Sequence, residues 1–419
     1  MPEKSSYVQN LEQCMKCNLC TFVCPMMEVN PFYPGPKKAG PDGERYRLMA
    51  PEFYDYALKY CLNCKRCEIS CPSDVKVGDI IQRARLKYAG HNLRDYMLAS
   101  TDLVGILASP FAPVLNPVLR SKTVKGAMHL LAGVDSRRTF PSYSSRKFTS
   151  WYRKNVRDGF IKGESAPTGK FVSFFHGCYV NYNYPRLGED LLRLVNAAGY
   201  GVRLLEKERC CGVALISNSF GSQARRQAIV NLDSMRKAVG RGEDIITVSS
   251  TCTFTMRDEY SHVLDLENSD VRPHLMLLSK WLYGKIESGE VQLKFNPDFR
   301  LRVAYHTACH MQKLGWRNYT LELLKLIPGV ELVELPQNCC GIAGTFGFKK
   351  ENYRYSQTIG DKLFTDIRLA RGPQELESDV PFVVCTECET CKWQIEMSTG
   401  IPVLNPVSIL ASALFSSRQ

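Results

Sequence analysis

CMKCNLCTFVCP at residues 14–25 and CLNCKRCEISCP at residues 61–72 are two copies of one cysteine pattern, C-x2-C-x2-C-x3-C-P. Three cysteines separated by two residues each can wrap one loop around a cubic [4Fe–4S] cluster and present thiolates to three of its irons. Structural zinc is held by two separated pairs of ligands, and it gains nothing from a third cysteine at the same spacing or from the C-x3-C-P ending. The pattern therefore predicts two [4Fe–4S] clusters and not zinc.

The fourth cysteine of each copy is expected on the helix that follows, where it points away from its own loop and serves the other cluster, as in bacterial ferredoxins. One cluster is thus predicted on Cys14, Cys17, Cys20 and Cys71, and the second on Cys61, Cys64, Cys67 and Cys24. Two adjacent clusters of this kind carry single electrons along a path. No residue near them is predicted to be catalytic.

An internal repeat follows the two cysteine loops. FVSFFHGC at 171–178 is echoed by LRVAYHTAC at 301–309, and ERCCGVA at 208–214 by QNCCGIA at 337–343. Each copy reads as strand, long helix, strand, Cys-Cys-Gly, helix, strand and a last cysteine group. Strands that alternate with helices predict an α/β layer with a mostly parallel sheet in each copy.

The predicted fold class is α+β and multidomain: a helical ferredoxin domain with two [4Fe–4S] clusters, followed by two α/β Cys-Cys-Gly repeat domains. We place the ferredoxin domain at 1–92, a connecting arm at 93–165, the first Cys-Cys-Gly domain at 166–295 and the second at 296–419. The 419 residues are enough for domains of this number and size.

The cysteines of each Cys-Cys-Gly domain are expected at the carboxyl ends of parallel strands, which meet in one crevice. The first copy offers Cys178, Cys210, Cys211 and Cys252; the second offers Cys309, Cys339, Cys340, Cys385, Cys388 and Cys391. Adjacent cysteines rarely chelate one ion tetrahedrally. A multi-iron cluster of unusual shape, or dithiol chemistry, is therefore favoured over zinc, and buried cysteines that act as small apolar side chains are the plain alternative.

The chain has 18 cysteines and begins MPEKSSYVQN, without an apolar signal sequence. We therefore expect a cytoplasmic, reducing environment in which clustered thiols are available as metal ligands. The net charge of +12 alone would suit a nucleic-acid binder, but the cysteine spacing does not support a zinc module and no recognition element accompanies it. We expect no nucleic-acid partner.

Most of the excess positive charge lies in residues 120–157 of the connecting arm. That stretch contains one acid, Asp135, and ten basic residues: Arg120, Lys122, Lys125, Arg137, Arg138, Arg146, Lys147, Arg153, Lys154 and Arg157. Before it, residues 103–119 carry no charge but are interrupted by three prolines, so a spanning helix is not expected. Either the arm packs on the protein's own domains, or its apolar and basic parts together contact an anionic membrane surface.

Over nearly its whole length, the chain resembles the family that includes the D subunit of heterodisulfide reductase and the iron–sulfur subunit of glycolate oxidase. Three segments are most similar to the branch formed by the C subunits of anaerobic glycerol-3-phosphate dehydrogenases: PFYPGPKKAGPDGERYRL (31–48), KYCLNCKRCEISCPSDVKVGDIIQRAR (59–85) and ETCKWQIEMST (389–399). The resemblance implies a subunit that is not an enzyme on its own. It would take electrons from a flavin-bearing catalytic dimer, made of the A and B subunits, and pass them to menaquinone. It would also help to anchor the complex, as a peripheral protein on the cytoplasmic face of the membrane.

The resemblance also bears on the Cys-Cys-Gly copies, whose intact form in this family is Cys…Cys-Cys-Gly…Cys-x-x-Cys. The second copy matches with Cys309, Cys339, Cys340, Cys388 and Cys391, which implies a third, atypical cluster; Cys385 is an extra or an alternative partner for Cys388. In the first copy, Ser249 stands where Cys388 would align, so a five-thiolate site is not expected there. A heterodisulfide-reductase-like enzyme, or a glycolate- or lactate-oxidase-type iron–sulfur subunit, is the alternative function.

Overall fold

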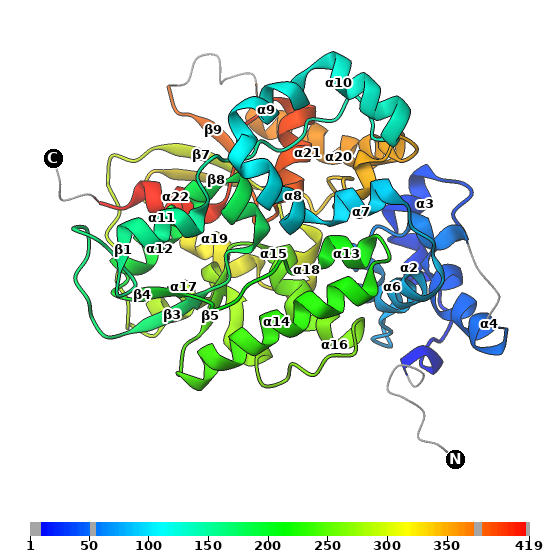
Figure 1. The fold of residues 1–419 in the computed structure, drawn as a ribbon, viewed down its shortest axis with the longest axis horizontal. Coiled ribbons are helices and arrows are strands. Elements are labelled where there is room, and N and C mark those ends of the chain that lie inside the picture. The colour runs from blue at the N-terminus through cyan, green and yellow to red at the C-terminus, as the bar shows by residue number, and fades with distance from the viewer. Residues whose placement is uncertain (1–9, 51–55, 373–378, 416–419) are drawn as a thin grey trace.

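The computed structural model describes residues 10–50, 56–372 and 379–415. The N-terminal part is helical and lies at one end of the molecule, in blue in Figure 1. Its helices are α2 (Leu19–Phe22), α3 (Pro25–Val29), η1 (Lys38–Asp42), α4 (Gly43–Met49), η2 (Tyr56–Tyr60), α5 (Arg66–Ile69) and α6 (Val77–Tyr88). The expected helical N-terminal domain is confirmed.

The two cysteine loops have the same backbone conformation. Short helix α2 begins after Asn18, whose φ is 68°, and α5 begins after Lys65, whose φ is 62°. Two residues earlier in each loop, Lys16 and Asn63 also have positive φ, at 60° and 55°. Residues other than glycine adopt this left-handed region only when the surroundings hold them there. The shared strain shows that the sequence repeat is also a structural repeat.

The connecting arm is helical. It comprises α7 (Leu93–Ala99), α8 (Thr101–Ala108), η3 (Ser109–Phe111), α9 (Ala112–Arg120), α10 (Lys122–Ala127) and η4 (Met128–Ala132), drawn in cyan in Figure 1. Pro110 and Pro113 stand in the first turns of η3 and α9, where a missing N–H costs little; Pro117 lies inside α9. The prolines therefore do not interrupt the helical stretch 101–120 as the sequence suggested.

That stretch, Thr101–Arg120, is the one helix of the described residues that is long and apolar enough to cross a membrane by length and composition. A single helix of this kind is weak evidence for a span. Its small residues face the protein: Gly105, Ala108 and Ala112 are buried. A methyl group at Gly105 would lie 2.4 Å from the ring of Tyr182, so the glycine permits close packing on the first Cys-Cys-Gly domain.

The chain then enters the first sheet through α11 (Phe148–Asn155) and the hairpin of β1 (Val156–Arg157) and β2 (Phe160–Ile161). The sheet contains β3 (Phe171–Phe174), β4 (Gly201–Leu204), β5 (Ile245–Thr247) and β6 (Leu275–Leu277), all parallel, in the order β4-β3-β5-β6. Its helical segments are η5 (Tyr179–Asn183), α12 (Pro185–Ala197), α13 (Val213–Ser217), α14 (Gly221–Gly240), α15 (Ser250–Phe254), η6 (Thr255–Glu259), α16 (Tyr260–His262), η7 (Arg272–His274) and α17 (Leu278–Glu287).

The second sheet repeats this topology. It contains β7 (Leu301–Tyr305), β8 (Val330–Glu334), β9 (Phe382–Cys385) and β10 (Val403–Leu404), all parallel, in the equivalent order β8-β7-β9-β10. Its helices are α18 (Cys309–Leu314), α19 (Arg317–Lys325), η8 (Phe346–Phe348), α20 (Tyr353–Arg371), α21 (Glu389–Thr399) and α22 (Pro406–Ala413). The predicted internal repeat is confirmed. Each copy also has a fourth strand, β6 or β10, that we did not predict because two or three residues carry too little periodic pattern.

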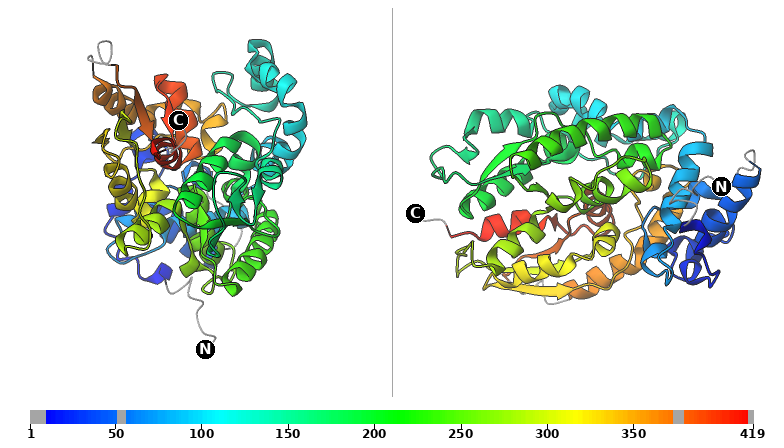
Figure 2. Two further views of the ribbon diagram at one scale, coloured as in Figure 1. Left: turned by 90° about the vertical axis from the view of Figure 1, so that its left-hand side faces the viewer. Right: turned by 90° about the horizontal axis from the view of Figure 1, so that it is seen from below.

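The two Cys-Cys-Gly domains lie side by side (Figure 2) and share one apolar core. Leu191 and Val195 of α12 and Leu410 of α22 belong to this core, and Ser408 of α22 donates a hydrogen bond to Asp190 of α12 at 2.7 Å. The N-terminal domain packs on the second copy, since its apolar cluster includes Phe346 and Ile359. The three parts are therefore held together through continuous cores.

Candidate iron–sulfur sites

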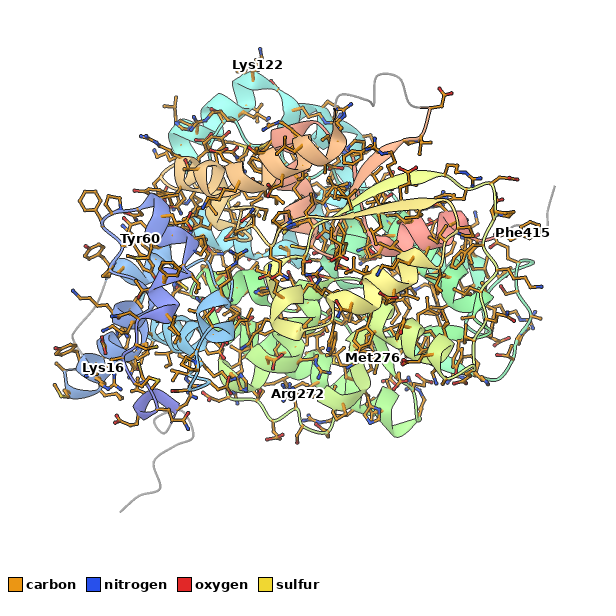
Figure 3. The ribbon with its side chains drawn as sticks, turned by 180° about the vertical axis from the view of Figure 1, so that it is seen from behind. Lys16, Tyr60, Lys122, Arg272, Met276 and Phe415 are labelled. Atoms are coloured by element: carbon orange, nitrogen blue, oxygen red, sulfur yellow. The ribbon has the colours of Figure 1, made fainter. Side chains whose placement is uncertain are left out.

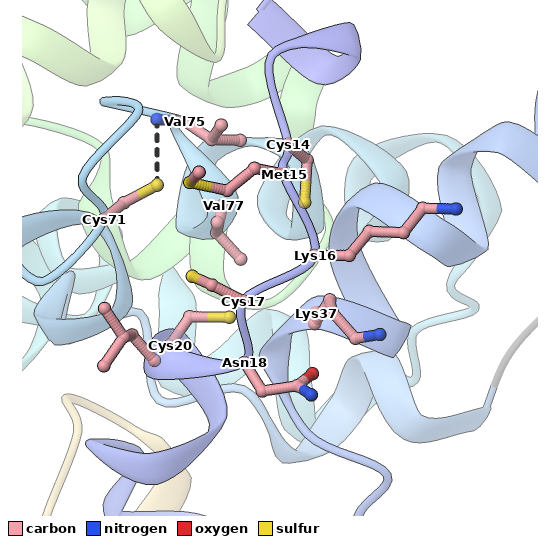
Figure 4. Close-up of a pocket in the computed structure, with 11 residues that line it drawn as sticks. Cys14, Met15, Lys16, Cys17, Asn18, Cys20, Lys37, Cys71, Val75 and Val77 are labelled. Carbon is pink, nitrogen blue, oxygen red and sulfur yellow. Dashed lines mark hydrogen bonds between the residues drawn. The ribbon is translucent and has the colours of Figure 1, made fainter.

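The first predicted ligand set lines one cavity. Cys14, Cys17, Cys20 and Cys71 line it together with Val75 and residues of the first loop (Figure 4). The backbone N–H of Val75 donates a hydrogen bond to the Cys71 sulfur at 3.3 Å. Cys71 comes from the second cysteine run, so the crossed arrangement expected from the spacing is the one that the structure brings together.

The second set, Cys24, Cys61, Cys64 and Cys67, lines a second cavity. The Gln82 amide donates to the Cys61 sulfur at 3.7 Å, and Tyr33 also lines the cavity. Two cavities, each bounded by four thiols from both runs, fit two inorganic clusters. The described residues contain no group of three or more Cys, His, Asp or Glu side chains spaced to hold a single metal ion.

The two loops differ in exposure. Cys17 and its neighbours Lys16 and Asn18 are exposed, whereas Asn63 and Lys65 of the second loop are buried. The second loop is covered because it faces both Cys-Cys-Gly domains. His310 contacts the Asn63 carbonyl oxygen at 3.0 Å. The Asn63 amide donates to Glu259 at 2.6 Å.

Lys65 is the centre of a buried ion cluster at this junction. Its ammonium group lies 2.5 Å from Asp79 and 3.3 Å from Glu259. Glu68 is 3.7 Å away and also pairs with Lys313 at 3.0 Å. Burial opposes the charge, but the surrounding carboxylates more than offset it and raise the pKa of Lys65 well above its ordinary value. The cluster ties the second loop to both repeat domains.

Burial raises the pKa of one thiol in the first cavity and of three in the second. The pKa of Cys24 rises to about 12, chiefly by burial and then by the nearby charge of Cys64. Burial also raises the pKa of Cys20, Cys64 and Cys67. Since iron binds thiolates, a bound metal must supply the charge that stabilises the deprotonated sulfurs.

The second Cys-Cys-Gly copy gathers the five predicted thiols close to the second cavity. The sulfurs of Cys340 and Cys391 are 3.2 Å apart, and the N–H of Cys391 donates to Cys388 at 3.5 Å. The N–H of Gly341 donates to Cys339 at 3.4 Å. The pKa of Cys309 is raised by burial and then by the charges of Cys64, Cys388 and Cys340, and the adjacent His310 contacts Asn63 of the second loop, so Cys309 lies near the second cavity.

Cys385 stands apart from that set. It ends strand β9 and is fully buried. Burial and then the charge of Glu387 raise its pKa, and no thiol contributes to the shift. The sequence left Cys385 open as an alternative partner for Cys388; the structure favours the five cysteines without it.

The first copy gathers its four thiols too, but without a fifth. Cys178 hydrogen-bonds to Cys210, which raises the pKa of Cys178 and lowers that of Cys210. Cys211 shares hydrogen bonds with Cys210 and Cys252, which raise its pKa. The N–H of Cys210 also donates to Asp102 of arm helix α8 at 2.6 Å. The arm thus contacts this thiol group directly.

Ser249 takes the position that Cys388 has in the second copy. Ser249 caps α15 by accepting from the N–H of Cys252 at 3.2 Å, as Cys388 caps α21 by accepting from Cys391. The Ser249 hydroxyl donates to Glu389 of the other copy at 3.0 Å. The two thiol groups are therefore neighbours, with Thr251 of the first 3.8 Å from the Cys388 sulfur of the second.

His176 and His306 stand at equivalent positions in the two copies but differ in their contacts. His176 lies 3.1 Å from Glu208, and burial lowers its pKa to about 4. His306 is 1% exposed and neither ring nitrogen has a hydrogen-bond partner; burial lowers its pKa to about 4 as well. Sequence reasoning missed Tyr33, Gln82 and Lys65, because nothing in their spacing to the cysteines marks them.

The fold and the thiol groups agree with comparisons to known proteins. A 4Fe-4S dicluster domain matches residues 10–75, and a cysteine-rich domain matches residues 172–257 and again 303–396. The C subunit of anaerobic glycerol-3-phosphate dehydrogenase from Escherichia coli (strain K12) is 52% identical over 408 residues, which cover 97% of this chain and 99% of that protein. The chain belongs to the family of these anaerobic glycerol-3-phosphate dehydrogenase C subunits.

The resemblance seen in the sequence is thereby confirmed, and the domain matches make this member of the family an iron–sulfur protein. More distant relatives share parts of the pattern. The B subunit of fumarate reductase (CoM/CoB) from Methanothermobacter marburgensis is 25% identical, covering 93% of this chain and 68% of that protein. Lactate utilization protein A of Geobacillus kaustophilus is 28% identical, covering 42% of this chain and 74% of that protein.

Proposed function

We propose that the chain is the electron-transfer subunit of an anaerobic glycerol-3-phosphate dehydrogenase complex. It passes electrons from a flavin-containing catalytic dimer, made of the A and B subunits, to menaquinone, and it helps to anchor the complex on the cytoplasmic face of the membrane. The observation that carries the proposal is the pair of cavities, each lined by four thiols drawn from both cysteine runs. The division at 1–92, 93–165, 166–295 and 296–419 is part of the same proposal.

Two [4Fe–4S] clusters fit these cavities by ligand type and number. Cys14, Cys17, Cys20 and Cys71 would hold one; Cys61, Cys64, Cys67 and Cys24 would hold the other. When bound, such clusters accept and release single electrons at potentials set by the surrounding hydrogen bonds and solvent. The protein's own contribution is to leave the first loop open to a partner and to enclose the second.

The exposed loop is the proposed contact for the catalytic dimer. Apolar side chains that would ordinarily be buried surround it: Met15, Leu19, Phe22 and Phe32, with Phe22 86% exposed. Exposed apolar patches of this kind mark protein interfaces. The second loop in turn lies near Cys309 and His310, which offers electrons that enter at the first loop a path to the second Cys-Cys-Gly domain.

In that domain, we propose a third, atypical iron–sulfur cluster on Cys309, Cys339, Cys340, Cys388 and Cys391. Their mutual contacts and their position beside Cys64 support it. The thiols of the first copy, Cys178, Cys210, Cys211 and Cys252, are a weaker candidate because Ser249 replaces the fifth ligand.

The arm is the proposed membrane contact. A row of exposed apolar side chains runs along 101–120, including Leu107, Phe111 and Val114, and Leu130 and Leu131 extend it. Of the basic stretch, Arg138 is buried, where it donates to the Gly347 carbonyl, and Arg137 pairs with Asp135. Arg120, Lys122 and Lys125 are therefore the basic residues best placed to meet anionic lipid beside this row.

The test uses the reconstituted complex. Cys17→Ser or Cys64→Ser should abolish quinone reduction and leave reduction of an artificial dye by the catalytic dimer intact, because only the path beyond the flavin is cut. Anaerobically purified chain should contain about eight irons from the two four-iron clusters, and more with the third site filled. Loss of both activities, or zinc in place of iron, would contradict the proposal.

A further inference from the structure

Tyr33 is a buried side chain whose polar group has no evident structural role. It is 2% exposed, and its hydroxyl has no hydrogen-bond partner. Buried hydroxyls in native proteins are almost always hydrogen-bonded, so an orphan of this kind calls for a ligand. Tyr33 lines the second cavity, the one bounded by Cys24, Cys61, Cys64 and Cys67.

Burial raises the pKa of Tyr33 most. The charges of Cys61, Cys24 and Cys67 raise it further, and that of Arg85 opposes them. A phenol is a good donor, and thiolate or sulfide sulfur is an acceptor that carries negative charge. The cavity therefore presents the Tyr33 hydroxyl, beside the Nε–H of Arg66, as an unpaired buried donor to whatever sulfur-rich group the four cysteines hold.

We propose that Tyr33 is a positioning residue that donates its hydroxyl hydrogen bond to a sulfur of the second [4Fe–4S] cluster and raises the reduction potential of that cluster. The inference rests on the proposed function. A hydrogen bond to sulfur stabilises the reduced state, which carries one more negative charge, over the oxidised state. When one electron leaves the first cluster and one enters the second, this bond favours the transfer.

The first cavity is a natural comparison. Thr21 hydrogen-bonds to Cys20 of the first set but does not line the first cavity; it is partly exposed, and the loop before it is exposed. Water there competes for the same sulfur. The side chains around the second cavity are more buried, as Tyr33, Asn63 and Lys65 show, so a single hydroxyl there has more influence on a nearby charge.

Tyr33→Phe tests the inference because it removes only the hydroxyl. Tyr60→Phe is the matched control: its ring centroid lies 6.2 Å from that of Tyr33, but it does not line the cavity. The full chain is purified anaerobically and titrated by EPR. We expect Tyr33→Phe to lower the reduction potential of one of the two clusters by about 59 mV, which is about a tenfold change in the equilibrium constant of a one-electron couple. We expect Tyr60→Phe to leave both potentials unchanged.

No shift in Tyr33→Phe, an equal shift in Tyr60→Phe, or a shift of both clusters would overturn the inference. If Tyr33→Phe loses iron, pulsed EPR of the unaltered chain in H₂O and in D₂O provides the test. The exchangeable hydroxyl proton of Tyr33 should couple to the second cluster. Absence of this coupling also overturns the inference. Fewer than two clusters in the unaltered chain would instead overturn the proposed function.

Discussion

At the scale of single residues, the two cysteine loops differ most at the position after their middle cysteine. Asn18 in the first loop is exposed, whereas Lys65 in the second is buried among carboxylates. Both residues have the same strained backbone, so the difference is one of surroundings. A buried charge is tolerated only when it is paired, and removing one partner leaves the others uncompensated.

We therefore predict that Lys65→Met destabilises the fold by about 3–5 kcal/mol and lowers the iron content of the purified chain. Asp79 and Glu259 would be left buried without their main counter-ion. Lys76→Met is the control, because its pair with the exposed Asp74 should contribute at most about 1 kcal/mol. Urea unfolding and iron analysis under anaerobic conditions measure both. Equal losses in the two variants would contradict the role given to Lys65.

At the scale of elements, the glycines of the two Cys-Cys-Gly turns differ in how closely neighbouring atoms approach them. Gly212 and Gly341 both have positive φ, 88° and 81°. A methyl group at Gly212 would meet Ala224 at 3.6 Å, an ordinary contact. At Gly341 it would lie 1.9 Å from the Ser356 carbonyl oxygen on α20, which no small shift accommodates.

Gly212→Ala should therefore cost about 1–2 kcal/mol, the penalty of the left-handed conformation alone. Gly341→Ala should cost a further 1–3 kcal/mol or so, because α20 must move away from the turn. Urea unfolding of the two variants side by side measures the difference. Similar costs at the two positions would show that the packing of α20 on the second turn is looser than the structure indicates.

The arm helices present an apolar surface, and a charged substitution on that surface tests whether it contacts a membrane. Phe111→Asp should weaken binding of the chain to vesicles of anionic lipid at least tenfold, since it places a carboxylate where apolar contact and negative lipid headgroups meet. Leu369→Asp is the control, because Leu369 is equally exposed but lies on α20. Vesicle co-sedimentation at two salt concentrations measures the effect. Equal binding by both variants would indicate that the arm packs on the protein's own domains and does not contact the membrane.

At the scale of the whole molecule, the two exposed apolar surfaces lie in different places. Figure 3 shows Lys16, in the first cysteine loop, at one end of the molecule, and Lys122 at the tip of the arm along another edge. The second loop and the two Cys-Cys-Gly thiol groups lie in the interior between the domains. One face is thus available to a protein and another to a membrane.

This separation predicts that the two contacts can be lost independently. Phe22→Asp should weaken association with the catalytic dimer and leave vesicle binding unchanged, whereas Phe111→Asp should do the reverse. Each variant is the other's control for folding. Co-purification with the dimer and vesicle co-sedimentation provide the two measurements. Loss of both contacts in either variant would mean that the two surfaces are not separate.

The sequence by itself predicted the two cysteine sets that the structure brings together, the repeat and the family, because cluster ligation depends on cysteine spacing within short loops and sheet strands depend on local apolar runs. It also located the replacement of a cysteine by Ser249. Only the tertiary structure decided that the first loop is open and the second enclosed, that Lys65 and Tyr33 are buried beside it, and that Cys309 adjoins Cys64. These features join residues far apart in the chain, and burial and charge pairing across domains leave no periodic mark on the sequence.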